Sequence, residues 1–331
     1  RSAIGAPLNN FAAIHDFDGD GDSDILGTTG QDTPNSDTLV WARNDGNGKF
    51  TILDNIDQTS GDFLQGVAVG QFQATSGLEV ALSWHAVNED VQMLTVPADP
   101  SSGIWSWRTA SDTSQNEELS VGDIDGDSDL DLLMGTQWLR NQGATFEALS
   151  LAETSGAPDR NRLVDMNGDG RLDAVVSYEA ISTLGKLVWY EQPASSDSTW
   201  AEHSIAEVIG PMSLDVVDMD HDGDFDVVVG EHNIADSSRA RMLIYENIDG
   251  VGQSWAEHLV HTGDEHHDGA HVIDVDEDGD YDIVSIGWSH NRVLLYENTD
   301  KPCGQTTVAP KSILPQGSST VWHAPIRSPA S

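Results

Sequence analysis

Five short segments of the chain place oxygen-bearing side chains at one fixed spacing. Counted from the first acid, these side chains occupy positions 1, 3, 5 and 9, and glycine usually stands at position 6. Calcium prefers about six to eight oxygen ligands, and alternate residues of a tight turn can direct several oxygens at one centre. The spacing therefore predicts about five Ca²⁺ sites, one in each segment. The predicted ligands are Asp16, Asp18, Asp20, Asp24, Asp123, Asp125, Asp127, Asp131, Asp165, Asn167, Asp169, Asp173, Asp218, Asp220, Asp222, Asp226, Asp274, Asp276, Asp278 and Asp282.

The alternative is a set of solvated hairpin turns, because Asp and Gly favour turns in any case. Turn preference alone does not repeat the same spacing in five segments, so we favour calcium. The loops are not equal: Asn167 supplies a neutral oxygen, and Ser128 stands where the other four loops have glycine. A sixth, degenerate copy at residues 70–81 has lost all but its last acid, Glu79, and we expect it to bind no metal.

A second group of residues offers acid–base chemistry. A polysaccharide lyase that cleaves by β-elimination needs a base for the C5 proton, an acid for the leaving oxygen and a cation to neutralise the uronate carboxylate. His232 or His271 is the candidate base, Tyr178 the candidate acid, and Arg160 or Arg162 the candidate cation. Only the types of these residues match those that a lyase needs, and no sequential catalytic signature accompanies them.

A third group suits binding without catalysis. Aromatic rings with a few polar neighbours fit the faces of sugars, and we expect such a site at Trp84, His85, Trp138, Asp215, His267, Trp288 and His290. The main interpretation is therefore a binding module for a glycan or an extracellular protein, with the lyase as the alternative. Zn²⁺ or another transition metal is a further possibility at the His cluster of residues 266–271, which lacks the ligand spacing of a zinc signature.

These residues belong to a repeat of about fifty residues. In each unit one apolar or alternating run precedes the acidic loop and three follow it, separated by Gly, Asn and Asp turns. Four short strands per unit indicate a four-stranded antiparallel sheet, and six such units predict an all-β fold, a β-propeller of six blades with seven as the alternative. We expect residues 1–300 to form a single propeller domain. Residues 301–331 are a Pro- and Ser-rich extension, in which 321–326 resembles a last outer strand.

The blade also predicts where the second and third groups lie. If the acidic loop joins the first and second strands at one end, residues before the first strand and after the second emerge at the other end. Because side chains alternate along a strand, Arg160, Arg162, Asp215 and His271 are expected to share one direction there. We therefore expect the polar and aromatic candidates to line an axial face opposite the calcium loops.

The acidic loops within units of about fifty residues resemble the FG-GAP/VCBS repeats of integrin α-subunit propellers, secreted bacterial proteins and some fungal lectins. The resemblance covers nearly all of residues 1–300. It implies a propeller, usually seven-bladed, with calcium in hairpin loops on one face. Members of the family are adhesion modules, lectins or polysaccharide lyases, so the resemblance implies no single function.

Composition excludes some partners. With 15 Lys and Arg against 56 Asp and Glu, the formal net charge is −41, which argues against nucleic acid because phosphate binding needs clustered basic residues. No apolar run is long enough to span a membrane, so we expect no membrane insertion. The opening residues show no signal-peptide pattern, which suggests a mature or trimmed product. Calcium loops of ordinary affinity fill outside cells, so we expect a secreted protein.

Overall fold

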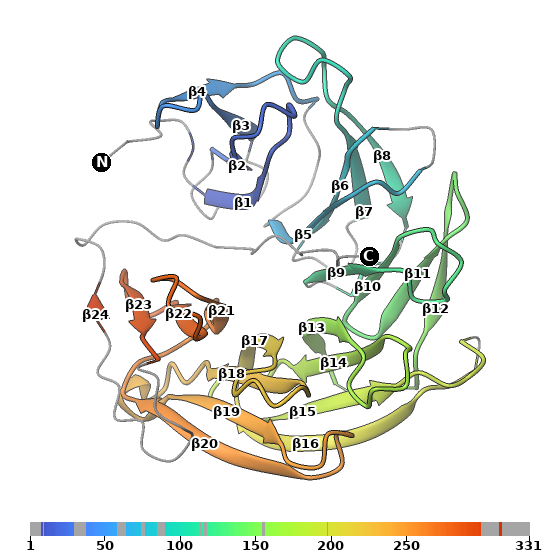
Figure 1. The fold of residues 1–331 in the computed structure, drawn as a ribbon. Helices are drawn as coiled ribbons and strands as arrows, with labels where there is room; N and C mark the ends of the chain where they lie inside the picture. The colour runs from blue at the N-terminus through green and yellow to red at the C-terminus, as the bar shows by residue number, and fades with distance from the viewer. Residues whose placement is uncertain are drawn as a thin grey trace. The chain divides into compact units, whose positions relative to one another are not determined.

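In a computed structural model, the described residues are 8, 10–29, 38–57, 64–73, 77–84, 90–112, 114–115, 118–153, 156–196, 198–298 and 311–312. Within these residues the fold is all-β, with six four-stranded antiparallel sheets that each follow chain order (Figure 1). The sheets are blades of the β-propeller class, which confirms the fold predicted from the repeat. No helix in this described part of the chain is both long and apolar enough to cross a membrane.

The described chain divides into two compact units, one ending at Leu149 and the other beginning at Ser150. The first unit holds three blades. Their strands are β1 (Asn10–His15), β2 (Asp24–Thr28), β3 (Leu39–Asn44) and β4 (Phe50–Leu53); β5 (Leu64–Gly70), β6 (Glu79–Trp84), β7 (Val91–Thr95) and β8 (Ser106–Ser111); and β9 (Leu119–Gly122), β10 (Asp131–Met134), β11 (Gln137–Asn141) and β12 (Phe146–Ser150), whose last residue crosses the boundary.

The second unit holds the other three blades. Their strands are β13 (Pro158–Val164), β14 (Asp173–Tyr178), β15 (Leu184–Glu191) and β16 (Ala201–Ile209); β17 (Pro211–Val217), β18 (Asp226–Glu231), β19 (Arg241–Asn247) and β20 (Trp255–Thr262); and β21 (His271–Ile273), β22 (Asp282–Ile286), β23 (Val293–Tyr296) and β24 (Lys311–Ser312). A short 3₁₀ helix, η1 (Ser237–Arg239), lies between β18 and β19. The last outer strand is thus β24, within the C-terminal extension, whereas residues 321–326 lie outside the described residues.

Within each unit the first strands of consecutive blades lie side by side: β1, β5 and β9 in one unit, and β13, β17 and β21 in the other. The second strands of the first five blades are buried on both faces, as in β18, whose six residues are all buried, whereas β22 is partly half-buried. This explains why these strands read as continuous apolar runs rather than as alternating patterns.

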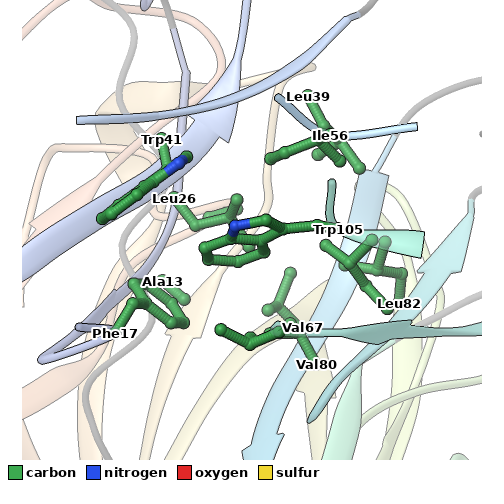
Figure 2. Packing of buried hydrophobic residues seen from close by; sticks show 13 residues of the cluster. Ala13, Phe17, Leu26, Leu39, Trp41, Ile56, Val67, Val80, Leu82 and Trp105 are labelled. Atoms are coloured by element: carbon green, nitrogen blue, oxygen red, sulfur yellow. The ribbon is translucent and has the colours of Figure 1, made fainter. Parts of the chain in front are cut away.

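The cores lie between neighbouring blades. In the first unit Trp41 and Trp105 are fully buried and their rings lie 5.2 Å apart, with Phe17 packed edge-on against Trp105 (Figure 2). Both indole N–H groups donate hydrogen bonds, that of Trp41 to Asn55 Oδ1 and that of Trp105 to Pro100 O. Trp189 occupies a comparable position between the fourth and fifth blades. Such filled interfaces hold the ends of each strand, and therefore the loops, in fixed positions.

A β-bulge recurs near the start of the first strand in four blades. The register shifts between Phe11 and Ala13, Leu64 and Gly66, Pro158 and Asn161, and Pro211 and Ser213. A bulge inserts an extra residue and re-aims the side chains around it. In β13 the residues within the bulge are Asp159 and Arg160, so the bulge decides where these two side chains lie.

Candidate functional site

Four of the acidic loops gather their carboxylates closely enough to hold a cation. In each loop three Asp residues bring one oxygen apiece within 4.8 Å of one another. The groups are Asp16, Asp18 and Asp24; Asp123, Asp125 and Asp127; Asp218, Asp220 and Asp226; and Asp274, Asp276 and Asp282. Each group lies where the first strand of its blade turns into the second.

The first Asp of each loop shapes the turn. In the fifth blade Asp218 accepts backbone hydrogen bonds from Asp222 N (3.0 Å) and Gly223 N (3.1 Å). Gly223 has a φ of 103°, a left-handed conformation that costs a glycine little, which explains glycine at position 6. Ser128 takes the same place in the third blade with a φ of 79°, so this loop keeps the turn at the cost of backbone strain.

The last Asp of each loop ties three strands together. Asp226 is almost fully buried and accepts hydrogen bonds from Met219 N and Asn247 N, both at 2.9 Å. The equivalent carboxylates Asp24, Asp131, Asp173 and Asp282 each accept the same two kinds of backbone hydrogen bond. Burial raises the pKa of Asp24, Asp131 and Asp226 to about 6 and that of Asp173 to about 7. A bound cation would offset this penalty and keep the carboxylates ionised.

The donor set fits a hard cation such as Ca²⁺. All the ligands are oxygens, and the oxygens Asp18 Oδ1, Asp123 Oδ1 and Asp125 Oδ1 are buried without a hydrogen-bond partner. Among the residues that the structure describes, the His cluster at 266–271 forms no comparable group of three ligand atoms. The zinc site considered from the sequence stays a prediction.

Two loops carry an arginine beside the acids. In the fourth loop Arg171 forms an ion pair with Asp169 and donates from Nε to Gln192 O at 3.0 Å. In the degenerate second loop Arg108 Nη2, from the outer strand β8, lies 3.6 Å from the fully buried carboxylate of Glu79. A guanidinium thus supplies positive charge in the loop that has lost its metal-type acids.

The first strands of the second unit carry several of the polar candidates, and Arg162 and Asp215 each stand three residues before the first acid of the following loop. Arg162 donates from Nε to Asp215 Oδ1 at 3.0 Å, and Asp215 Oδ2 accepts from Val272 N at 2.9 Å. These contacts link β13, β17 and β21, the first strands of three blades. Asp215 and Arg162 therefore stabilise the arrangement of the blades through a paired charge.

Arg160 forms the centre of a neighbouring network. Its guanidinium is mostly buried and contacts Asp159 Oδ1 at 2.9 Å and Asp268 Oδ1 at 3.1 Å. The other oxygen of Asp268 lies 2.7 Å from His267 Nδ1. Burial alone would lower the pKa of His267, but Asp268 beside it raises that pKa overall.

His232 is held by a buried carboxylate. Its Nδ1 contacts Glu265 Oε1, and the other oxygen of Glu265 accepts from Ser289 N at 2.9 Å. Burial alone would raise the pKa of Glu265, but the hydrogen bonds from His232 and Ser289 hold it below its usual value. The His232 ring lies edge to face against His267, with centroids 4.5 Å apart. Glu265 thus orients the His232 ring through Nδ1, and Nε2 is the ring nitrogen that does not contact this carboxylate.

Trp288 is the exposed aromatic residue at this end. It follows β22, its side chain is 68% exposed, and its ring centroid lies 5.5 Å from that of His267. His290 is anchored nearby, with Nε2 3.0 Å from Glu265 O. Trp288, His267, His232, Glu265, Arg160, Asp159 and Asp268 form what we term the Trp288 cluster.

The remaining candidates lie elsewhere. Tyr178 is buried, and its hydroxyl lies 2.6 Å from that of Tyr190, while His271 is half-buried at the start of β21. In the first unit Trp84 ends β6 and is 2% exposed. Trp138 is 1% exposed within β11, because only two residues separate β10 from β11. His85 lies outside the described residues.

Sequence reasoning left three members of the Trp288 cluster out of the candidate site: Asp159, Glu265 and Asp268. A signal was present, since Asp159 precedes Arg160, and Glu265 and Asp268 flank the pair His266 and His267. Acids next to basic or imidazole side chains at a strand start are candidates for pairing, but the partners lie as far as 108 residues apart.

Comparison with protein families supports the repeat. No curated protein sequence matches the chain. One similar solved structure is the crystal structure of the V. cholerae biofilm matrix protein Bap1, with 14% identity, a TM-score of 0.43, and coverage of 94% of this chain and 54% of that chain. This chain therefore spans about half the length of Bap1. Residues 165–229 match the family model described as an FG-GAP-like repeat. The chain is thus a β-propeller chain that carries an FG-GAP-like repeat, as its acidic loops predicted.

Proposed function

We propose that the chain is a calcium-stabilised, secreted binding module that recognises a carbohydrate through the blade ends opposite the acidic loops. A protein partner is the alternative occupant of the same face. The observation that carries this proposal is the Trp288 indole, 68% exposed beside a network of buried, mutually paired polar side chains. A flat aromatic face on a rigid support suits the apolar face of a sugar ring, and such sites lose little freedom on binding.

Calcium would be held by the four Asp groups and by the loop at residues 165–173, and would neutralise carboxylates that the fold buries together. In this role the ion stiffens the blades and takes no part in recognition. Loops of ordinary affinity fill in calcium-rich extracellular fluid, which supports secretion. Chelation with EGTA should lower the Tm and Ca²⁺ should restore it, whereas a Tm that does not change would contradict the role of calcium.

Binding is tested with a glycan array and calorimetry on the calcium-loaded protein. Trp288→Ala should weaken glycan binding and leave the Tm unchanged, because the side chain is mostly solvent-exposed. Trp107→Ala, which removes a 36% exposed indole on β8, is the matched control and should bind like the wild type. The protein partner would be favoured by two results together. The glycan array would show no binding, and a pull-down would recover a protein with the wild type but not with Trp288→Ala.

A second candidate, a polysaccharide lyase, is favoured by the contact between His232 and Glu265. A carboxylate that orients an imidazole is a common arrangement for a general base. The candidate cations give less support, since Arg160 and Arg162 each contact carboxylates of the chain. Incubation with ulvan, alginate or pectin would produce an unsaturated uronate that absorbs near ~235 nm if proton transfer of this kind occurs. If the absorbance rises with none of these polymers, the lyase hypothesis is wrong.

A further inference from the structure

The Trp288 cluster contains more carboxylates than cations. Its carboxylates are Asp159, Glu265 and Asp268, and its one guanidinium, that of Arg160, pairs with Asp159 and Asp268. The two imidazoles each contact one of these carboxylates. The cluster is therefore negative whenever both histidines are neutral, and the formal charge of −41 on the whole chain adds to the same sign.

Three other guanidiniums of the second unit are already paired with carboxylates of the chain. Arg162 is paired with Asp215, Arg241 with Glu231, and Arg292 with Asp264. A ligand carboxylate that reached Arg160 would have to displace Asp159 or Asp268, and a displaced buried carboxylate is costly. Arg239 is exposed on η1, in the connection between β18 and β19, and takes no part in the contacts of the Trp288 cluster. The arrangement therefore disfavours an anionic sugar at Trp288.

A cationic sugar displaces no carboxylate, because each oxygen of Asp268, although paired with Arg160 or His267, can accept a further contact from an ammonium group. The indole face attracts a cation through its quadrupole, and His267 connects Trp288 to Asp268. Asp268 is the most exposed of the three carboxylates, with 20% of its side chain accessible, against 0% for Asp159 and Glu265. One ligand can thus place a sugar ring on Trp288 and an ammonium group toward Asp268.

We propose that the ligand of the Trp288 cluster is a glycan of amino sugars with free ammonium groups. This proposal rests on the proposed binding function and specifies its ligand class. Trp288 contacts the sugar face, Asp268 faces the ammonium group, and Arg160 and His267 hold Asp268 in place. The negative charge of the cluster weakens the binding of uronate polymers, and N-acetylated polymers lose the ionic contact.

The test compares three oligosaccharides of matched length by calorimetry near physiological salt: glucosamine, N-acetylglucosamine and galacturonate oligomers. We expect the glucosamine oligomer to bind about tenfold more tightly than the N-acetylated one, and the galacturonate oligomer to bind most weakly. Trp288→Ala should weaken binding of both amino-sugar oligomers. Asp268→Asn should remove the preference for the free amine while binding of the N-acetylated oligomer remains.

Controls separate this site from the general acidity of the chain. Asp236→Asn neutralises an exposed acid near the same end and should leave the preference intact; a loss equal to that of Asp268→Asn would overturn the proposal. Tighter binding of the galacturonate oligomer than of the glucosamine oligomer would also overturn the proposal. This comparison needs only the wild-type protein, so it holds even if Asp268→Asn does not fold. If oligolysine binds as tightly as the glucosamine oligomer and Trp288→Ala weakens that binding, the amino-sugar proposal is wrong and the ligand is a basic peptide. If no oligosaccharide binds, the proposed carbohydrate-binding function itself fails.

Discussion

Arg108 in the degenerate second loop offers a sharp test of how this fold replaces a metal ion. The carboxylate of Glu79 is fully buried, and Arg108 Nη2 lies 3.6 Å from it with 28% of its own side chain exposed. Removing one partner of a buried ion pair costs about 3–5 kcal/mol. The distance and the partial exposure of Arg108 reduce this figure, and the Thr95 hydroxyl still lies 3.5 Å from Glu79. We expect Arg108→Met to lower the free energy of unfolding by about 1–3 kcal/mol.

Urea denaturation with linear extrapolation measures this change, with and without Ca²⁺. The loss should be the same in both conditions, because this loop lacks the acidic ligands. Adding Glu79→Gln should recover most of the stability, since the buried charge is then gone. Arg43→Met is the control: its partner Asp45 is exposed whereas Glu79 is buried, so the loss of this pair should cost less than about 1 kcal/mol. If Arg108→Met costs no more than Arg43→Met, the guanidinium does not stand in for a cation.

Two further predictions concern buried polar groups. Asp226→Ala removes the acceptor of two backbone N–H groups and should cost about 2–6 kcal/mol in urea denaturation even in EGTA, whereas a loss below about 1 kcal/mol would show that water replaces the carboxylate. Burial lowers the pKa of His266 to about 3 from its ordinary 6.5, although Asp264 and Glu265 oppose the shift. Between these values only the unfolded chain binds the proton, so this residue should lower the free energy of unfolding by about 1.4 kcal/mol per pH unit as the pH falls below about 6.5. His266→Gln should flatten that slope between about pH 4 and 6, and an unchanged slope would contradict the assignment.

The repeated features of the fold could be predicted because they are local. The spacing of the acids, the glycine at position 6 and the apolar runs around each loop recur every fifty residues or so, and each acts within one blade. The blade class and the placement of Trp288 beyond the end of β22 followed from them. The loop at residues 165–173 is one of these local features, and it lies within the residues that match the FG-GAP-like repeat.

The pairings at the opposite end could not be predicted, because they join residues that are distant in sequence. Strand alternation placed Arg160 and Arg162 in one direction, but the bulge between Pro158 and Asn161 decides where Arg160 lies, and its partner Asp268 is 108 residues away. Trp138 was expected beyond a strand end, yet the two-residue turn after β10 makes it part of a buried strand.

The sequence by itself thus determined the blade, its acidic loop and the direction in which each strand runs, since these depend on neighbours within a few residues. Only the tertiary structure decided which charges neutralise one another at the opposite end. Buried carboxylates take whatever cation or N–H group the packing of neighbouring blades brings within reach. That packing pairs Glu265 with His232 and Arg160 with two acids, and it leaves Trp288 exposed beside them.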